Sequence, residues 1–180
     1  MSSLVKVVGG TWNCDRDWSY WEASDGEFTL QAEPGIREYK SYRWIGLDCS
    51  LAHSSFGRLA NHIAGNPAAE FFSLRWFQHA ANAPIDSSVS ESLTRLMREA
   101  RGIATATPLE VFIDEFEVNR PDGPSMGQLR HLAALAWKAN VSTLLDYQGI
   151  LRKGKRLNFV PMITASMVER ALDEALKRAP

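Results

Sequence analysis

The chain has 180 residues, a formal net charge of −1 and two cysteines, Cys14 and Cys49. This length suits a single domain, residues 1–180, with a hydrophobic core of its own. The near-neutral charge excludes a globally basic nucleic-acid-binding surface, and the distant cysteines exclude a disulfide framework or a zinc motif. Because no signal-peptide pattern or long apolar run is seen, we expect a cytoplasmic protein without membrane contact.

Residues 1–50 have the pattern of an antiparallel β-meander. Short runs rich in β-branched and aromatic residues are separated by turn-forming pairs at Asp25-Gly26 and Pro34-Gly35. The expected strands cover residues 4–8, 27–32 and 36–47. Tryptophans and tyrosines are dense near the start of this portion, where they either fill the core of a β-layer or stack on bases.

Residues 68–180 are expected to form an α/β core on which the β-rich N-terminal portion packs. The aromatic run within 68–78 predicts a buried strand. A helix follows, with Ser88 and Glu91 as its capping box and Gly102 at its end. The fold class is therefore α/β (α+β), with a mixed-sheet core and flanking helices.

The segment from Pro108 to Tyr147 predicts a strand, a polar loop at 121–124, a helix with Ser125 as its N-cap, and a second strand at 141–147. A helix that begins beside glycine presents unpaired N–H groups and the positive end of its dipole, which suits phosphate. Arg130 adds a forked donor one turn later. The alternative is a capped helix with a surface arginine.

The acidic residues of the first of these strands suggest a metal site. Because side chains alternate along a strand, Glu115 and Glu117 are expected on one face. Two carboxylates beside a phosphate-binding helix suit Mg²⁺, which prefers oxygen ligands and activates water for attack on phosphate. The alternative is a solvated acidic face of an edge strand.

Basic residues offer a local surface for a polyanion such as DNA, despite the neutral total charge. They are Arg120, Arg152, Lys153, Lys155 and Arg156. The alternative is a basic hairpin tip in solvent. After this cluster we expect a strand at 157–163 and an amphipathic helix at 164–178.

The middle of the chain resembles the core of the ParB/sulfiredoxin superfamily. The matching residues are Glu91-Ser92-Leu93, Gly102, Pro108-Leu109, Gly127-Gln128-Leu129-Arg130 and Ala133-Ala134. Gln128 replaces the acidic residue usual in ParB and the catalytic cysteine of sulfiredoxins, so reductase chemistry is not expected. A ParB-type DNA-reading helix-turn-helix domain is not seen in the sequence either.

This resemblance implies that Ser125, Gly127, Gln128 and Arg130 hold the phosphates of ATP or another nucleoside triphosphate. Glu115 and Glu117 then serve Mg²⁺ or the attacking water, with Arg130 as a further catalytic residue. Small plasmid-encoded members act in conjugation control and fertility inhibition. The implied function is thus ATPase or DNase activity in that setting, with a nucleotide, DNA and a conjugation or secretion-system protein as partners.

Two other functions remain open. The segments 44–48 and 111–115 resemble the acid-bearing strands of RuvC-like, RNase H-fold endonucleases through Asp48 and Asp114, with acids of the terminal helix as further ligands. The third possibility is a non-enzymatic phage or plasmid inhibitor that binds a protein partner through its aromatic N-terminal layer.

Overall fold

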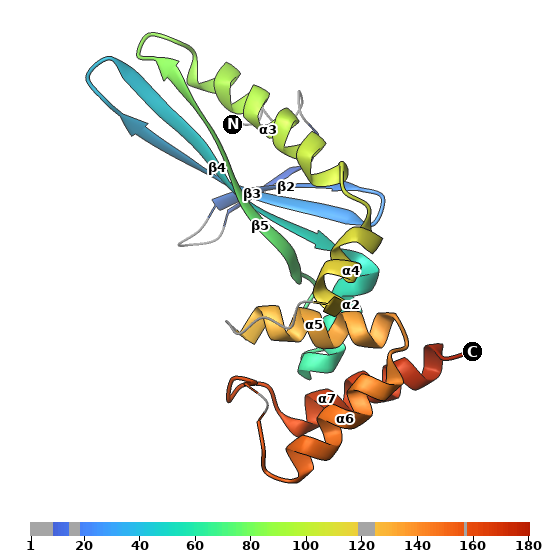
Figure 1. Ribbon diagram of the computed structural model, residues 1–180. Helices are drawn as coiled ribbons and strands as arrows, with labels where there is room; N and C mark the ends of the chain where they lie inside the picture. The colour runs from blue at the N-terminus through green and yellow to red at the C-terminus, as the bar shows by residue number, and fades with distance from the viewer. Residues whose placement is uncertain (1–8, 15–18, 119–124, 157) are drawn as a thin grey trace. The chain divides into compact units, whose positions relative to one another are not determined.

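The computed structural model describes residues 9–14, 19–118, 125–156 and 158–180. The chain forms two compact units, each built from two separate stretches (Figure 1). The first, which we call the sheet unit, comprises Met1–His53 and Ser73–Thr107. The second, which we call the helical unit, comprises Ser54–Phe72 and Pro108–Pro180.

The sheet unit contains an antiparallel meander whose five strands follow the order of the chain. The strands are β1 (Thr11–Cys14), β2 (Ser19–Asp25), β3 (Phe28–Glu38), β4 (Tyr42–His53) and β5 (Ser73–Pro84). The expected β-rich N-terminal portion is therefore confirmed, and β5 adds a strand to it. The expected strand at 4–8 lies outside the described residues.

The turn expected at Pro34-Gly35 is wrong, because β3 continues through both residues. The pairing of β2 with β3 ends at Trp21 and Ala32, so Pro34 pairs on one side only, with Leu47 of β4. A proline without a partner on one side is tolerated in a strand, since its missing N–H leaves no gap in a ladder. The reversal comes later, where the Tyr39 amide donates to the Tyr42 carbonyl at 2.8 Å.

Helix α3 (Val89–Thr105) packs on one face of this sheet (Figure 1). Its start is confirmed, since the Ser88 hydroxyl accepts a bond from the Glu91 amide. Alternate residues of β4 face this helix and are at most 2 % exposed, and they share the core with apolar residues of α3: Ile45, Leu47, Cys49 and Leu51 with Leu96, Met97 and Ala100. The opposite face of the sheet is more polar, as period-two alternation requires.

The helical unit is centred on α5. Its helices are α2 (Ser54–Ala64), α4 (Leu109–Val118), α5 (Ser125–Trp137), α6 (Val141–Arg152) and α7 (Ala165–Arg178). Helix α5 contacts each of the other four. Residues 132–136 of α5 are all at most 1 % exposed. A helix that is apolar all round is buried among its neighbours, and α5 has that position here.

The coarse α+β class is confirmed, but the strands expected at 108–117 and 141–147 are wrong, since these residues form α4 and α6. In α4 the apolar residues Leu109, Phe112 and Ile113 are buried and Val111 is 52 % exposed, a helical stripe rather than strand alternation. Helix α6 is capped by Asn140, whose side chain accepts a bond from the Thr143 amide. The strand expected at 157–163 is also wrong, since the described residues 158–163 form turns and irregular structure.

Candidate functional site

The helical unit carries an open pocket of about 380 Å³. Residues of α2, α5 and α7 line it: Ser55, Arg58, Leu59, His62, Trp137, Glu174 and Arg178. Most of these side chains are polar or cationic, and one is a large aromatic ring. A volume of this size lies in the range of natural small-molecule sites.

One wall of the pocket is a stack of a cation on an aromatic ring. The Arg178 guanidinium carbon lies 5.6 Å from the centre of the Trp137 ring. The ring is itself supported by Phe56, whose ring centre is 5.9 Å away. Cation–π attraction and this packing hold a positive charge beside an aromatic ring.

The carboxylate of Glu174 lies among basic side chains. Its oxygens lie 2.6 Å from the Lys177 ammonium, 3.2 Å from the Arg178 guanidinium and 3.7 Å from His62 Nε2. The hydrogen bond from Lys177 lowers the pKa of Glu174, and the charges around it act in the same direction. This acid is therefore ionised at neutral pH, and its charge is offset by its neighbours.

Arg58 gives the pocket its surplus positive charge. Its guanidinium donates to the Ser55 hydroxyl at 3.4 Å, and its side chain is exposed. No salt bridge of Arg58 is found within the part of the chain that the structure describes. With Arg58 and Arg178 set against Glu174 alone, an anion entering the pocket meets net positive charge and two forked donors.

The residues expected to bind phosphate lie at the start of α5, where two of them have structural partners. Gln128 is fully buried, donates to the Asn158 carbonyl at 3.0 Å and accepts from the Val160 amide at 2.8 Å. Arg130 lies over the Phe116 ring, at 5.7 Å from its centre, and burial lowers the pKa of Arg130. Ser125 is the first residue of α5, and Gly127 is half-buried.

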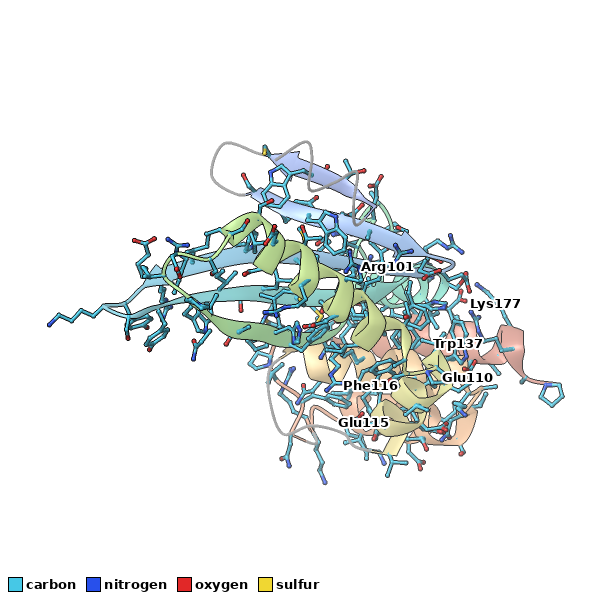
Figure 2. All side chains as sticks on the ribbon, turned by 90° about the horizontal axis from the view of Figure 1, so that it is seen from above. Arg101, Glu110, Glu115, Phe116, Trp137 and Lys177 are labelled. Atoms are coloured by element: carbon cyan, nitrogen blue, oxygen red, sulfur yellow. The ribbon has the colours of Figure 1, made fainter. Side chains whose placement is uncertain are left out.

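The two glutamates expected to share a face do not share one. They lie two residues apart on a helix, α4, which places their side chains roughly 200° apart around its axis. Glu115 is exposed on α4 (Figure 2), whereas Glu117 accepts a bond from the Asn140 amide group at 3.1 Å. Among the described residues, no cluster of three or more His, Cys, Asp or Glu side chains is placed to hold a metal ion.

The basic residues suggested for DNA divide into two kinds. Arg152 pairs with Glu169 at 3.4 Å, and Arg156 donates to the carbonyls of Phe159, Val160 and Ile163 at 3.2, 2.7 and 2.8 Å. Arg156 therefore holds the loop before α7. Lys153 and Lys155 are exposed to solvent, and Arg120 lies outside the described residues.

The two aspartates suggested for an RNase H-type site, Asp48 and Asp114, lie on different kinds of element and have different partners. Asp48 is exposed on β4 and accepts a bond from the Gln78 side chain at 2.8 Å. Asp114 is on α4, where its carboxylate lies 2.6 Å from the Lys138 ammonium. The expectation that Asp114 lies on a strand is therefore wrong.

Several structurally important polar residues carry no local sequence motif. His131 is 3 % exposed; its Nδ1 donates to the Phe116 carbonyl at 2.7 Å, and its Nε2 lies 3.1 Å from the Tyr147 hydroxyl. A histidine within an apolar helical run is the one hint of this role in the sequence. The pocket residues Arg58, Trp137 and Arg178 are far apart in the chain, and no spacing rule connects them.

These observations define an α+β protein with an antiparallel sheet unit and a helical unit that carries a cationic, tryptophan-lined pocket. Residues 2–176 match the model of a family of unknown function, DUF6990, and the chain belongs to this family. The searches of curated proteins and of solved structures found no match. Over the described residues, every helix is too short or too polar to cross a membrane.

Proposed function

We propose that this protein binds a nucleotide in the pocket of the helical unit. The observation that carries the proposal is Arg58, an arginine that lines the pocket without a salt bridge among the described residues. Arginine binds phosphate through two parallel hydrogen bonds, and such bonds are strongest where no carboxylate competes. The surplus charge of the pocket attracts the phosphates of the ligand.

The stack of Arg178 on Trp137 supports the choice of a nucleotide over a simple anion. Nucleic acid bases stack on aromatic rings and on guanidinium planes. Arg178 and Trp137 both line the same pocket as Arg58 and can supply such planes. A ligand that combines phosphate with a flat ring uses both features at once.

The geometry favours binding over hydrolysis in this pocket. Its lining contains one carboxylate, that of Glu174, which is already paired with Lys177 and Arg178. A carboxylate held in ion pairs is a poor general base, and His62, the other possible base in the lining, faces the Glu174 carboxylate at 3.7 Å. The Mg²⁺-dependent ATPase or DNase activity implied by the resemblance to ParB/sulfiredoxin proteins remains a prediction, with Ser125, Gly127 and Arg130 as its separate candidate site.

Calorimetric titration of the purified protein with ATP, CTP, adenosine and inorganic phosphate tests this proposal. We expect Arg58→Gln to weaken ATP binding about tenfold or more, since a charged hydrogen bond is lost. Arg152→Gln, an exposed arginine of the same unit outside the pocket, is the matched control and leaves the Kd unchanged. Adenosine and phosphate alone bind more weakly than ATP.

Two results separate the candidate sites. Binding that survives Arg58→Gln but is lost in Arg130→Gln and Gly127→Ala places the nucleotide at the start of α5. Absence of binding for every nucleotide ends the proposal. Release of phosphate or cutting of plasmid DNA, measured with and without EDTA, decides whether the chain is also an enzyme.

The turn between β3 and β4 supports a second candidate function, binding of a protein partner, for which a conjugation or secretion-system protein is the partner that the resemblance implies. Tyr39 and Tyr42 stack there with ring centres 4.6 Å apart, and both are exposed, at 45 % and 37 %. Exposed aromatic residues are typical of protein contacts. If this function is correct, expression of the chain lowers plasmid transfer, and the double variant Tyr39→Ser, Tyr42→Ser loses this effect, whereas Arg58→Gln retains it.

A further inference from the structure

Strand β5 forms a long edge of the sheet. It spans Ser73–Pro84, and among the described residues it pairs with β4 alone. In an antiparallel ladder, every second residue directs its N–H and C=O away from the neighbouring strand. The outer side of β5 is therefore a row of main-chain donors and acceptors along twelve residues, whereas β1 at the other edge has four.

This edge lacks the features that usually protect an edge strand. The run from Trp76 to Ala83 contains no proline and no Asp, Glu, Lys or Arg; Arg75 and Pro84 stand only at its two ends. Natural sheets protect exposed edges with short strands, charges or proline, because an unprotected edge pairs with other strands. The Trp76 side chain, at 63 % exposure, adds a large apolar surface beside this run.

We propose that β5 pairs antiparallel with β5 of a second copy of this chain, which joins the two sheets into one continuous sheet. Like charges placed opposite each other destabilise a pair of strands, and an uncharged run avoids this when it meets its own copy. Pairing about the middle of the run puts the two Arg75 side chains at opposite ends of the interface. Two copies of β5 can therefore pair without placing like charges opposite each other.

The symmetry of this pairing fixes the arrangement of the dimer. A two-fold axis that joins two edges into a continuous antiparallel sheet is perpendicular to that sheet, so residues of the same face stay on the same side. The two α3 helices then cover one face, and the two Trp76 side chains lie on the other. His79, on the α3 side of β5, already has a partner in Glu99 at 2.8 Å, so the pairing does not require it.

Sedimentation velocity of the full chain over a range of concentrations tests the proposal. We expect the wild type to be a dimer and Ala80→Lys, which places a charge in the middle of the exposed run, to associate about tenfold more weakly or not at all. Ala106→Lys, the same change at an exposed position just after α3, is the matched control and remains dimeric.

Hydrogen exchange gives a second measurement that needs no variant. Amides of residues 73–84 become slower to exchange as the protein concentration rises, because the outer N–H groups gain partners in the dimer. A wild type that stays monomeric at all concentrations overturns the proposal. A dimer that persists in Ala80→Lys, or that leaves the exchange of residues 73–84 unchanged, overturns it as well.

Discussion

The guanidinium of Arg178 is held between the ring of Trp137, 5.6 Å from its carbon, and the carboxylate of Glu174, 3.2 Å from its Nη1. The ring attracts the guanidinium charge, and the carboxylate accepts a hydrogen bond from it. A side chain restrained twice loses less conformational entropy when a ligand binds than a free arginine does. This relationship makes the pocket of the helical unit a pre-organised site.

Replacing Arg178 by lysine tests that stack. Arg178→Lys keeps the charge but removes the plane, so we expect nucleotide affinity to fall roughly threefold to tenfold while affinity for inorganic phosphate changes little. Calorimetric titration of both ligands measures this difference. Arg152→Lys serves as the control, and equal losses for both ligands would show that the plane of Arg178 has no part in binding.

Gln128 is expected to stabilise the protein rather than bind a ligand. Gln128→Ala leaves the Val160 amide and the Asn158 carbonyl without their side-chain partner, at a cost of about 2–4 kcal/mol in the free energy of unfolding. Urea unfolding measures the loss. Gln78→Ala, at an exposed position, costs less than about 1 kcal/mol. A variant at position 128 with unchanged stability but abolished nucleotide binding would return this residue to a ligand-binding role.

The Cys49 thiol is expected to be unreactive in the folded protein, and its burial is expected to lower the free energy of unfolding at alkaline pH. Burial, with a smaller effect of the Asp48 charge, raises the pKa of Cys49 from 9.0 to about 12. Above pH 9 the unfolded chain releases this proton and the folded chain keeps it, so the contribution of the thiol to stability is full below that pH and declines as the pH rises.

Urea unfolding between about pH 8 and about pH 10.5 measures this loss of stability, because the thiol of the unfolded chain titrates within that range. Cys49→Ala removes this part of the pH dependence, and the difference between the two proteins is the readout. Iodoacetamide should modify exposed Cys14 in the native state and reach Cys49 only after unfolding. Rapid native labelling of Cys49 would contradict its burial.

Gly46 is expected to be required by the ring of Trp44. A Cβ at position 46 would lie 2.3 Å from Cη2 of that ring. We expect Gly46→Ala to destabilise the protein by about 1–3 kcal/mol, because the ring must leave its position beside Arg37. Combining it with Trp44→Ala should cost less than the sum of the two single changes, as thermal unfolding can show. Gly102→Ala, at an exposed position of α3, is the control and stabilises the helix by about 0.5–1 kcal/mol.

Caps and turns could be predicted from the sequence where the interaction that forms them lies between neighbouring residues. Ser88 caps α3 because its hydroxyl accepts a neighbouring amide, and α5 begins at Ser125 after a segment rich in proline and glycine. The turn expected at Asp25-Gly26 is found where β2 ends at Asp25, before β3 begins at Phe28. In each case the interaction that decides the structure lies within a few residues, so it is visible without a fold.

Packing decided the rest. Val111 and Ile113 predicted a strand, because β-branched residues favour extended backbone. The segment instead forms helix α4, in which Leu109, Phe112 and Ile113 are buried together on one side. Because α4 is a helix, Glu115 and Glu117 lie on different sides of it, and the metal site predicted from their shared face is not formed.

The pocket shows the same division between sequence and structure. Arg58, Trp137 and Arg178 belong to α2, α5 and α7, and only the packing of these helices brings them together. The amino-acid sequence by itself determined the α+β class and the Ser88 cap of α3, since these depend on neighbouring residues. It predicted a buried strand within 68–78, whereas the tertiary structure places β5 at the edge of the sheet. The tertiary structure alone decided which distant cations share a pocket, because burial and charge pairing act between residues that are close in space, whatever their distance along the chain.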